Sequence, residues 1–152
     1  MNLISNINNS NHRKAITRLI SLADEIILCS GWIKYSGLKK LLPKLKKVIA
    51  DRKTSVTVYS NKAHTEEKCT EALAKITGVN HVIIDNDLKY FHSKLYYFVS
   101  KDNYYAIIGS ANITEGGLVG NDELSIQLSG KLNDDNHIKI RQYIENLKTY
   151  TS

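Results

Sequence analysis

The chain has 152 residues, of which 42% are hydrophobic, and this is the usual size of one domain with one sizeable core. We therefore expect residues 1–152 to form a single domain. The formal net charge of +6 favours polyanionic partners, such as nucleic acid or an anionic membrane surface, over cationic partners.

Neither a disulfide-linked secreted domain nor a membrane protein is indicated. The two cysteines, Cys29 and Cys69, lie far apart and fit neither a disulfide framework nor a zinc site. Asparagines interrupt the first twenty residues, where a signal peptide needs a continuous apolar run. No run reaches the roughly 18 apolar residues of a membrane span. We expect a cytoplasmic protein that does not associate with membranes.

Hydrophobic periodicity predicts alternating helices and strands in the first half of the chain. A lysine-rich segment has its leucines on one side, and Pro43 inside it either starts a second helical segment or kinks the first. The segment before it is too uniformly apolar for a strand with one exposed face. In chain order we expect a helix at 11–23, a strand at 25–33, a helix at 35–53, a strand at 55–60, a helix at 64–78 and a strand at 79–85.

Strands follow one another directly in the second half. A turn-like Ser-Lys-Asp-Asn at 100–103 joins two apolar strands. We expect strands at 92–99, 104–110 and 123–130 and a closing helix at 134–150. Strand–helix alternation followed by neighbouring strands predicts an α/β fold with a mixed central sheet flanked by helices on both faces.

The pattern His-x-Lys occurs three times, and only its context separates the copies. The copy at 12–14 precedes a predicted helix and the copy at 137–139 lies in one, where residues two apart diverge. His92 and Lys94 lie in a predicted strand, where residues two apart share a face. Only this pair is therefore expected to act together.

Small hydrogen-bond donors follow the next apolar strand. Ser110 and Asn112 are also two apart, and Gly109 before them leaves room for a ligand to approach the backbone. A histidine, a cation and two neutral donors suit a phosphoryl group. Lys94 would offset its charge, while Ser110 and Asn112 would hold its non-bridging oxygens.

An acidic residue is available to orient the histidine. Glu123 could accept a hydrogen bond from the second ring nitrogen of His92, and the adjacent Asp122 is the alternative. The sequence contains no cluster of carboxylates, or of His and Cys, with the spacing of metal ligands. We therefore expect neither a metal nor another cofactor.

Together, His92-x-Lys94, the Gly-Ser-x-Asn at 109–112 and the later Glu123 resemble the signature of the phospholipase D superfamily, in particular its small nucleases with one motif per chain. The resemblance implies a phospholipase D-like half-domain over nearly the whole chain. It implies that the catalytic residues are His92, Lys94, Ser110, Asn112 and Glu123.

The chain departs from the superfamily pattern at one position. The pattern has an aspartate five residues after the lysine, where this chain has Val99, and Asp102 follows in the predicted turn. The resemblance implies that in the superfamily this aspartate is a structural support more than a reacting group. The departure therefore weighs against phospholipase chemistry more than against nuclease chemistry.

The resemblance also implies a homodimer. In-line displacement at phosphorus needs a nucleophile on one side and an acid on the other, and one histidine cannot occupy both places. With one motif per chain, a twofold axis would pair His92 with His92 of the partner subunit. One would form a phosphohistidine, and the other would protonate the leaving oxygen.

Candidate substrate contacts lie outside the motif. The lysines of 39–53 are either the solvated face of an amphipathic helix or a track for phosphates. The aromatic residues that follow the first predicted strand are either core residues or ligand contacts. The predicted contacts are Lys40, Lys44, Lys47, Trp32 and Tyr35.

These features favour a metal-independent endonuclease that hydrolyses DNA, with RNA as a second substrate. One alternative is a phospholipase or phosphatidyl transferase, but nothing resembles an interfacial apolar helix, and lipid enzymes of the superfamily generally carry two motifs in a longer chain. Another is a catalytically inactive, nucleic-acid-binding dimer module, against which the intact His92 and Lys94 argue.

Overall fold

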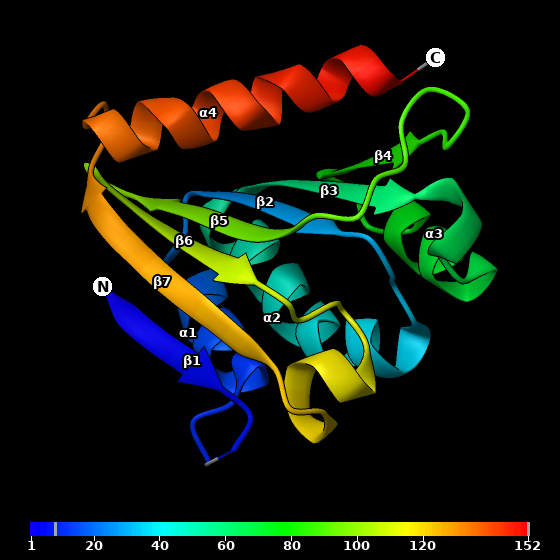
Figure 1. The fold of residues 1–152 in the computed structure, drawn as a ribbon, viewed down its shortest axis with the longest axis horizontal. Helices are drawn as coiled ribbons and strands as arrows, with labels where there is room; N and C mark the ends of the chain where they lie inside the picture. The colour runs from blue at the N-terminus through cyan, green and yellow to red at the C-terminus, as the bar shows by residue number, and fades with distance from the viewer. Residues whose placement is uncertain (8, 152) are drawn as a thin grey trace.

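The computed structural model describes residues 1–7 and 9–151, in which seven strands form one mixed sheet (Figure 1). The strands are β1 (Asn2–Ser5), β2 (Glu25–Ser30), β3 (Ser55–Asn61), β4 (Val79–Ile84), β5 (Lys94–Ser100), β6 (Asn103–Gly109) and β7 (Leu124–Lys131), in the spatial order β1-β7-β6-β5-β2-β3-β4. Strands β2, β3 and β4 are parallel, and all other neighbours are antiparallel. The predicted mixed sheet is confirmed.

Helices cover both faces of the sheet, as predicted. The helices are α1 (His12–Leu22), α2 (Tyr35–Arg52), α3 (Glu67–Ala74) and α4 (Asp135–Leu147), with 3₁₀ turns η1 (Lys62–His64) and η3 (Lys148–Tyr150) and a π-helix η2 (Gly116–Gly120). In Figure 1, α4 lies across one face, while α1 and α2 lie on the other. No helix in the described part of the chain is long and apolar enough to cross a bilayer.

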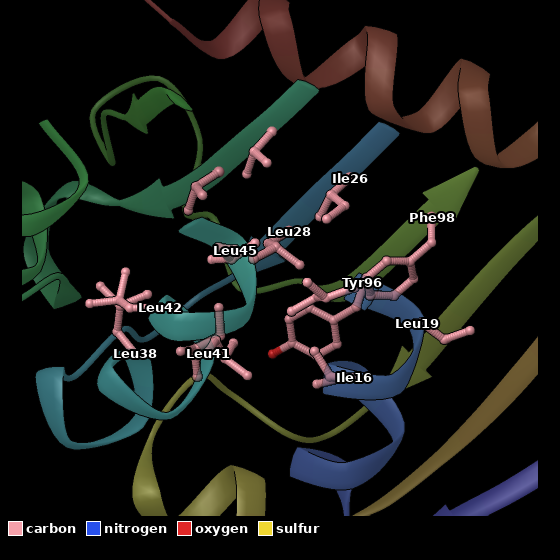
Figure 2. Close-up of a cluster of buried hydrophobic side chains, with 14 of the residues drawn as sticks. Ile16, Leu19, Ile26, Leu28, Leu38, Leu41, Leu42, Leu45, Tyr96 and Phe98 are labelled. Atoms are coloured by element: carbon pink, nitrogen blue, oxygen red, sulfur yellow. The ribbon is translucent and has the colours of Figure 1, made fainter. Parts of the chain in front are cut away.

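Two apolar clusters hold these layers together. Figure 2 shows the larger one, in which leucines of α2 and apolar side chains of α1 point at the strands; its members include Ile16, Leu19, Ile26, Leu28, Leu38, Leu41, Leu45, Tyr96 and Phe98. The second cluster lies under α4 and includes Ile27, Tyr97, Tyr104, Ile140, Ile144 and Leu147. Because side chains alternate along each strand, β5 contributes Tyr96 to one cluster and Tyr97 to the other.

The structure differs from the sequence predictions at several elements, and the strand expected at 25–33, for example, ends at Ser30. Strand β1 was not predicted, and it pairs with β7 at the sheet edge. Helix α2 runs unbroken through Pro43, so a second helix does not start there. The helix expected at 64–78 is the shorter α3, preceded by the turn η1. Strand β5 begins at Lys94, so His92 precedes the strand in which it was placed.

Candidate active site

Several strands meet at one edge of the sheet, and the predicted catalytic residues lie there. Strands β2, β3, β4 and β6 end at this edge, whereas β5 and β7 begin at it (Figure 1). The register sets Ser30 of β2 opposite Lys94 of β5, and Gly109 of β6 opposite Ser125 of β7. Residues just before β5 and β7 or just after β6 are therefore brought together, although they lie far apart in the chain.

The backbone around His92 is fixed by hydrogen bonds on both sides. The carbonyl of Phe91 accepts a hydrogen bond from Nδ2 of the fully buried Asn61 at 2.7 Å, and the carbonyl of Ser93 accepts one from the amide of Gly31 at 3.0 Å. A Cβ on Gly31 would stand 3.0 Å from Cα of His92, which is tighter than most contacts of this kind, so a larger residue would press on the His92 backbone. The exposed imidazole thus projects from a rigid support.

Neither supporting residue was predicted from the sequence. Asn61 is polar at the end of a buried strand, which is a weak signal for a residue that holds a neighbouring segment. Gly31 gave no signal, because the residue that approaches it lies far along the chain.

Lys94 is half-buried at the first position of β5. Desolvation lowers the pKa of its ammonium group below the ordinary value, and the nearby Glu123 carboxylate opposes this shift by favouring the charged form. The strand alternation expected for His92 and Lys94 does not apply, because His92 lies outside β5. Both residues nevertheless line the same pocket.

Asn112 is oriented by the segment that follows β2. Its Oδ1 accepts a hydrogen bond from the amide of Trp32 at 3.1 Å. The buried hydroxyl of Ser30 lies 3.5 Å from the same oxygen, donates to the carbonyl of Trp32 at 2.6 Å and accepts from the amide of Ile113 at 2.9 Å. Because the amide of Trp32 donates to it, the side-chain atom of Asn112 in this contact is the oxygen. The other atom, Nδ2, has no partner among the described residues and can donate to a ligand.

Ser110 is joined to Glu123. The Ser110 hydroxyl accepts a hydrogen bond from the amide of Leu124 at 3.0 Å and donates to Oε2 of Glu123 at 3.0 Å. The carbonyl of Leu124 is a second acceptor, 3.3 Å from the hydroxyl oxygen, so both acceptors of the Ser110 hydrogen belong to this chain. Within residues 1–7 and 9–151, no hydrogen bond joins Glu123 to His92, and the neighbouring Asp122 is exposed.

Two further features of the segment after β6 depend on packing. The phenol of the buried Tyr96 donates to the carbonyl of Ala111 at 2.5 Å, which holds the residue between Ser110 and Asn112. Burial also raises the pKa of this phenol. The space beside Gly109 is filled by Ser125 of β7. This glycine is therefore needed for strand packing, and because it also lines the pocket beside His92, the expectation that a ligand approaches its backbone stays a prediction.

A pocket of about 470 Å³ opens beside these residues, between the start of β5, the end of β6 and α4. His92 and Lys94 line it together with Lys139 and Tyr143 of α4, and its remaining side chains are mainly apolar. The hydroxyls of Ser93 and Tyr143 are hydrogen-bonded, which ties α4 to the segment that carries His92. The pocket thus offers two cations beside an exposed imidazole.

The predicted lysine contacts lie on α2, away from this pocket. Lys40 forms an ion pair with Glu115 at 2.8 Å, and Lys47 forms one with Asp51 at 3.1 Å. Helix α2 begins at Tyr35, at the edge of the sheet where the candidate site lies. A rise of roughly 1.5 Å per residue places Lys47 about 18 Å farther along the helix axis. Lys40, Lys44 and Lys47 therefore remain predicted contacts for a part of a long ligand that lies outside this pocket.

The two predicted aromatic contacts have different surroundings. Trp32 is 36% exposed, and its backbone binds Asn112 directly, so the structure brings it to the site. Tyr35 is half-buried, and the ammonium of Lys68 lies 4.1 Å from its ring centroid. In the described part of the chain, no group of three or more His, Cys, Asp or Glu side chains could hold a metal ion.

Comparison with known proteins gives one family and several structural relatives. The sequence model of the NgoFVII restriction endonuclease N-terminal PLD domain matches residues 8–151. NucT from Helicobacter pylori is 14% identical with a TM-score of 0.73, and the match covers 99% of this chain and 96% of that chain. Nuc from Salmonella typhimurium, a phospholipase D family member, is 14% identical with a TM-score of 0.72, over 98% of this chain and 91% of that chain.

A longer enzyme shares the same fold over part of its length. Yeast tyrosyl-DNA phosphodiesterase is 13% identical with a TM-score of 0.62, and the match covers 96% of this chain but 37% of that chain. At these identities the likeness concerns the fold alone. A search of curated proteins found no match.

Proposed function

Because the chain belongs to the family of the NgoFVII restriction endonuclease N-terminal PLD domain, we propose that residues 1–152 are one domain that hydrolyses DNA, and also RNA, without a metal ion. The chain is a phosphodiesterase and endonuclease of the phospholipase D superfamily. One observation carries the finer proposal: an exposed, rigidly supported His92 shares a pocket with Lys94, and an oriented amide donor lies at the same sheet edge.

The reaction has two displacement steps that need two imidazoles. A ring nitrogen of His92 forms a bond to phosphorus while the bond from phosphorus to the leaving oxygen breaks, and that oxygen takes a proton from His92 of the partner subunit. Water then attacks phosphorus, the phosphorus–nitrogen bond breaks, and the partner's imidazole accepts the water's proton. Both imidazoles finish in their starting protonation states.

The remaining site residues stabilise the phosphoryl charge. Lys94 offsets the negative charge that develops on the non-bridging oxygens, and the free Nδ2 of Asn112 donates a hydrogen bond to one of them. Glu123 lies close enough to Lys94 to favour its charged form, and it holds the Ser110 hydroxyl. In the dimer, Glu123 also orients an imidazole.

The surface around the site supports a dimer with a shared active site. Three large apolar side chains stand partly exposed there: Ile108 is 38% exposed, Leu124 58% and Tyr143 38%. Ile108 and Tyr143 line the pocket of His92, and Leu124 directly follows Glu123. A self-complementary contact across a twofold axis would cover these side chains and bring the second imidazole to the pocket.

Subunit mixing tests this proposal. Wild-type and His92→Ala chains are mixed in equal amounts, allowed to exchange subunits, and assayed on plasmid and on single-stranded DNA in excess EDTA. If one site needs both imidazoles, activity falls to about one quarter of the unmixed wild type, because only wild-type homodimers are active. Independent sites would leave about one half.

Mixing with Lys131→Ala, which changes an exposed side chain at the opposite edge of the sheet, is the matched control and should leave activity unchanged. Rapid acid-free quenching with labelled substrate should trap label on wild-type protein and none on His92→Ala. An active enzyme that shows half activity on mixing, or that carries no trapped label, contradicts the shared phosphohistidine site.

A further inference from the structure

Four rings form a row that ends at the candidate nucleophile. Trp32 follows β2, His64 lies in η1 after β3, Tyr90 follows β4, and His92 precedes β5. Trp32 and His64 are stacked with centroids 4.0 Å apart and planes 9° apart; His64 meets Tyr90 edge-on at 5.8 Å. The rings of Tyr90 and His92 are 5.8 Å apart and 28° from parallel. The row exists because all four segments leave the sheet at the same edge.

Tyr90 is exposed but held in place. Its side chain is 56% exposed, whereas Tyr96, Tyr97 and Tyr104 are each only 1% exposed. Its hydroxyl is hydrogen-bonded to Nε2 of His64 at 2.9 Å, and His64 is itself stacked on Trp32. A ring fixed in this way loses little conformational freedom when a ligand stacks on it. A tyrosine that served only the core would not stand open beside the reacting group.

Cations flank the same row. The ammonium of Lys34 lies 5.9 Å from the Trp32 ring centroid, and the exposed Lys89 precedes Tyr90 in the chain. Lys94 lies in the pocket of His92. An aromatic surface bordered by positive charge is the arrangement by which proteins bind single strands, because phosphates meet the cations while bases stack on the rings.

We propose that Tyr90 binds an unpaired base next to the phosphodiester at His92, so that the preferred substrate is a strand whose bases are unstacked at the cleavage site. A base inside a duplex has both faces covered and cannot stack on Tyr90. The proximity of the Tyr90 and His92 rings places that base on a nucleotide adjoining the scissile phosphate. The inference rests on the proposed function, since it assigns a substrate class to the same site.

Equilibrium binding in a His92→Asn background, which prevents turnover, tests the inference. The ligands are a short single-stranded oligodeoxynucleotide and an abasic oligomer with the same number of phosphates. Tyr90→Ala should weaken binding of the base-bearing strand about 5- to 160-fold and leave the abasic strand unchanged, because stacking contributes about 1–3 kcal/mol per base. Tyr90→Phe keeps the ring and should retain most of the affinity.

Two further measurements sharpen the test. Leu88→Ala changes an exposed side chain of the same loop that has no ring, and it should bind both oligomers like its parent. The chain has a single tryptophan, so quenching of Trp32 fluorescence by the base-bearing strand but not by the abasic strand reports contact with the row. Equal losses of affinity for both oligomers in Tyr90→Ala, or no loss for either, would overturn the inference.

Failure of the inference is distinguishable from failure of the proposed function. Cleavage of DNA by the wild-type protein depends on His92, whereas base-dependent binding is measured without turnover. A chain that cleaves DNA but binds both oligomers equally refutes only the role of Tyr90. A chain that binds through Tyr90 but cleaves nothing refutes only the nuclease reaction.

Discussion

The substitution Asn112→Asp tests the two ends of the Asn112 amide separately, because it keeps the oxygen acceptor and removes the Nδ2 donor. The retained oxygen can still accept the hydrogen bond from the amide of Trp32, which Asn112 Oδ1 accepts at 3.1 Å. The Nδ2 donor, in contrast, is replaced by a second carboxylate oxygen. Asn112→Ala removes both ends and introduces no charge. We therefore expect Asn112→Asp to be the more stable variant but the slower enzyme, and Asn112→Ala to be the less stable variant but the faster enzyme.

The magnitudes follow from the proposed role of Nδ2. Loss of one donor aimed at developing charge lowers kcat by about 10²- to 10³-fold, and this loss is common to both variants. The aspartate adds a negative charge beside the phosphoryl oxygens, and repulsion at about 4 Å costs about 1 kcal/mol in water and about 4 kcal/mol at an effective dielectric of 20. Asn112→Asp should therefore be about 5- to 900-fold slower than Asn112→Ala.

Stability should follow the reverse order. Asn112→Ala leaves the amide of Trp32 without its partner and should lower the free energy of unfolding by about 0.5–1.5 kcal/mol, whereas Asn112→Asp keeps the bond. Single-turnover cleavage and denaturant unfolding of both variants measure the two effects. If Asn112 only held the loop in place, activity would follow stability and the aspartate variant would be the faster one. That order would refute the assignment of Nδ2 as the donor.

The remaining predictions concern turnover, affinity and folding. His92→Ala should abolish cleavage, measured on plasmid in EDTA, while circular dichroism and the dimer are retained; magnesium-dependent activity that survives this change would contradict the mechanism. Replacing Lys40, Lys44 and Lys47 by Ala should reduce the salt slope of binding by about 0.9 for each lost phosphate contact, and an unchanged slope would show a solvated helix face. Burial lowers the pKa of His12 below 6.5, so the unfolded chain takes up the proton first. The contribution of His12 to stability is therefore complete above pH 6.5 and falls below it by at most about 1.4 kcal/mol per pH unit. Burial also lowers the pKa values of His81 and His137, so urea titrations should show that His12→Gln reduces the loss of stability below pH 6.5 without abolishing it.

Apolar periodicity was sufficient to predict the main helices and strands, because each of them buries a stripe or face that its own residues define. Strand β1 has no such pattern, since only Ile4 is buried and its pairing is supplied by β7, more than a hundred residues away. The start of α3 was misplaced for a similar reason. The side chain of Asn61 accepts from the amide of Ala63 and stabilises η1, and Thr65 bridges to Ile33. The hydrogen bond at Asn61 is local and the bridge to Ile33 is a tertiary contact, and together they override the helical pattern.

The order of residue types in the motif was enough to select the residues that meet at the sheet edge. It could not reveal how they are held, because the supporting contacts join distant segments. Ser30 and Asn112 are 82 positions apart, and Asn61 and Phe91 are 30 positions apart. Tyr90 was missed because it lies in a polar loop without periodicity. Its proximity to His64 and His92 arises only when three strand ends converge.

The position of Val99 shows why the departure from the superfamily pattern does not reach the reacting centre. Val99 pairs with Glu25 and Tyr104 near the end of β5 that is opposite to Lys94. At roughly 3.3 Å per residue, five residues of strand separate it from Lys94 by about 17 Å. Val99 packs there against the apolar cluster under α4, where an unpaired carboxylate would be costly to bury. The valine therefore alters the packing beneath α4, while the residues proposed to act on the phosphodiester all lie at the other edge of the sheet.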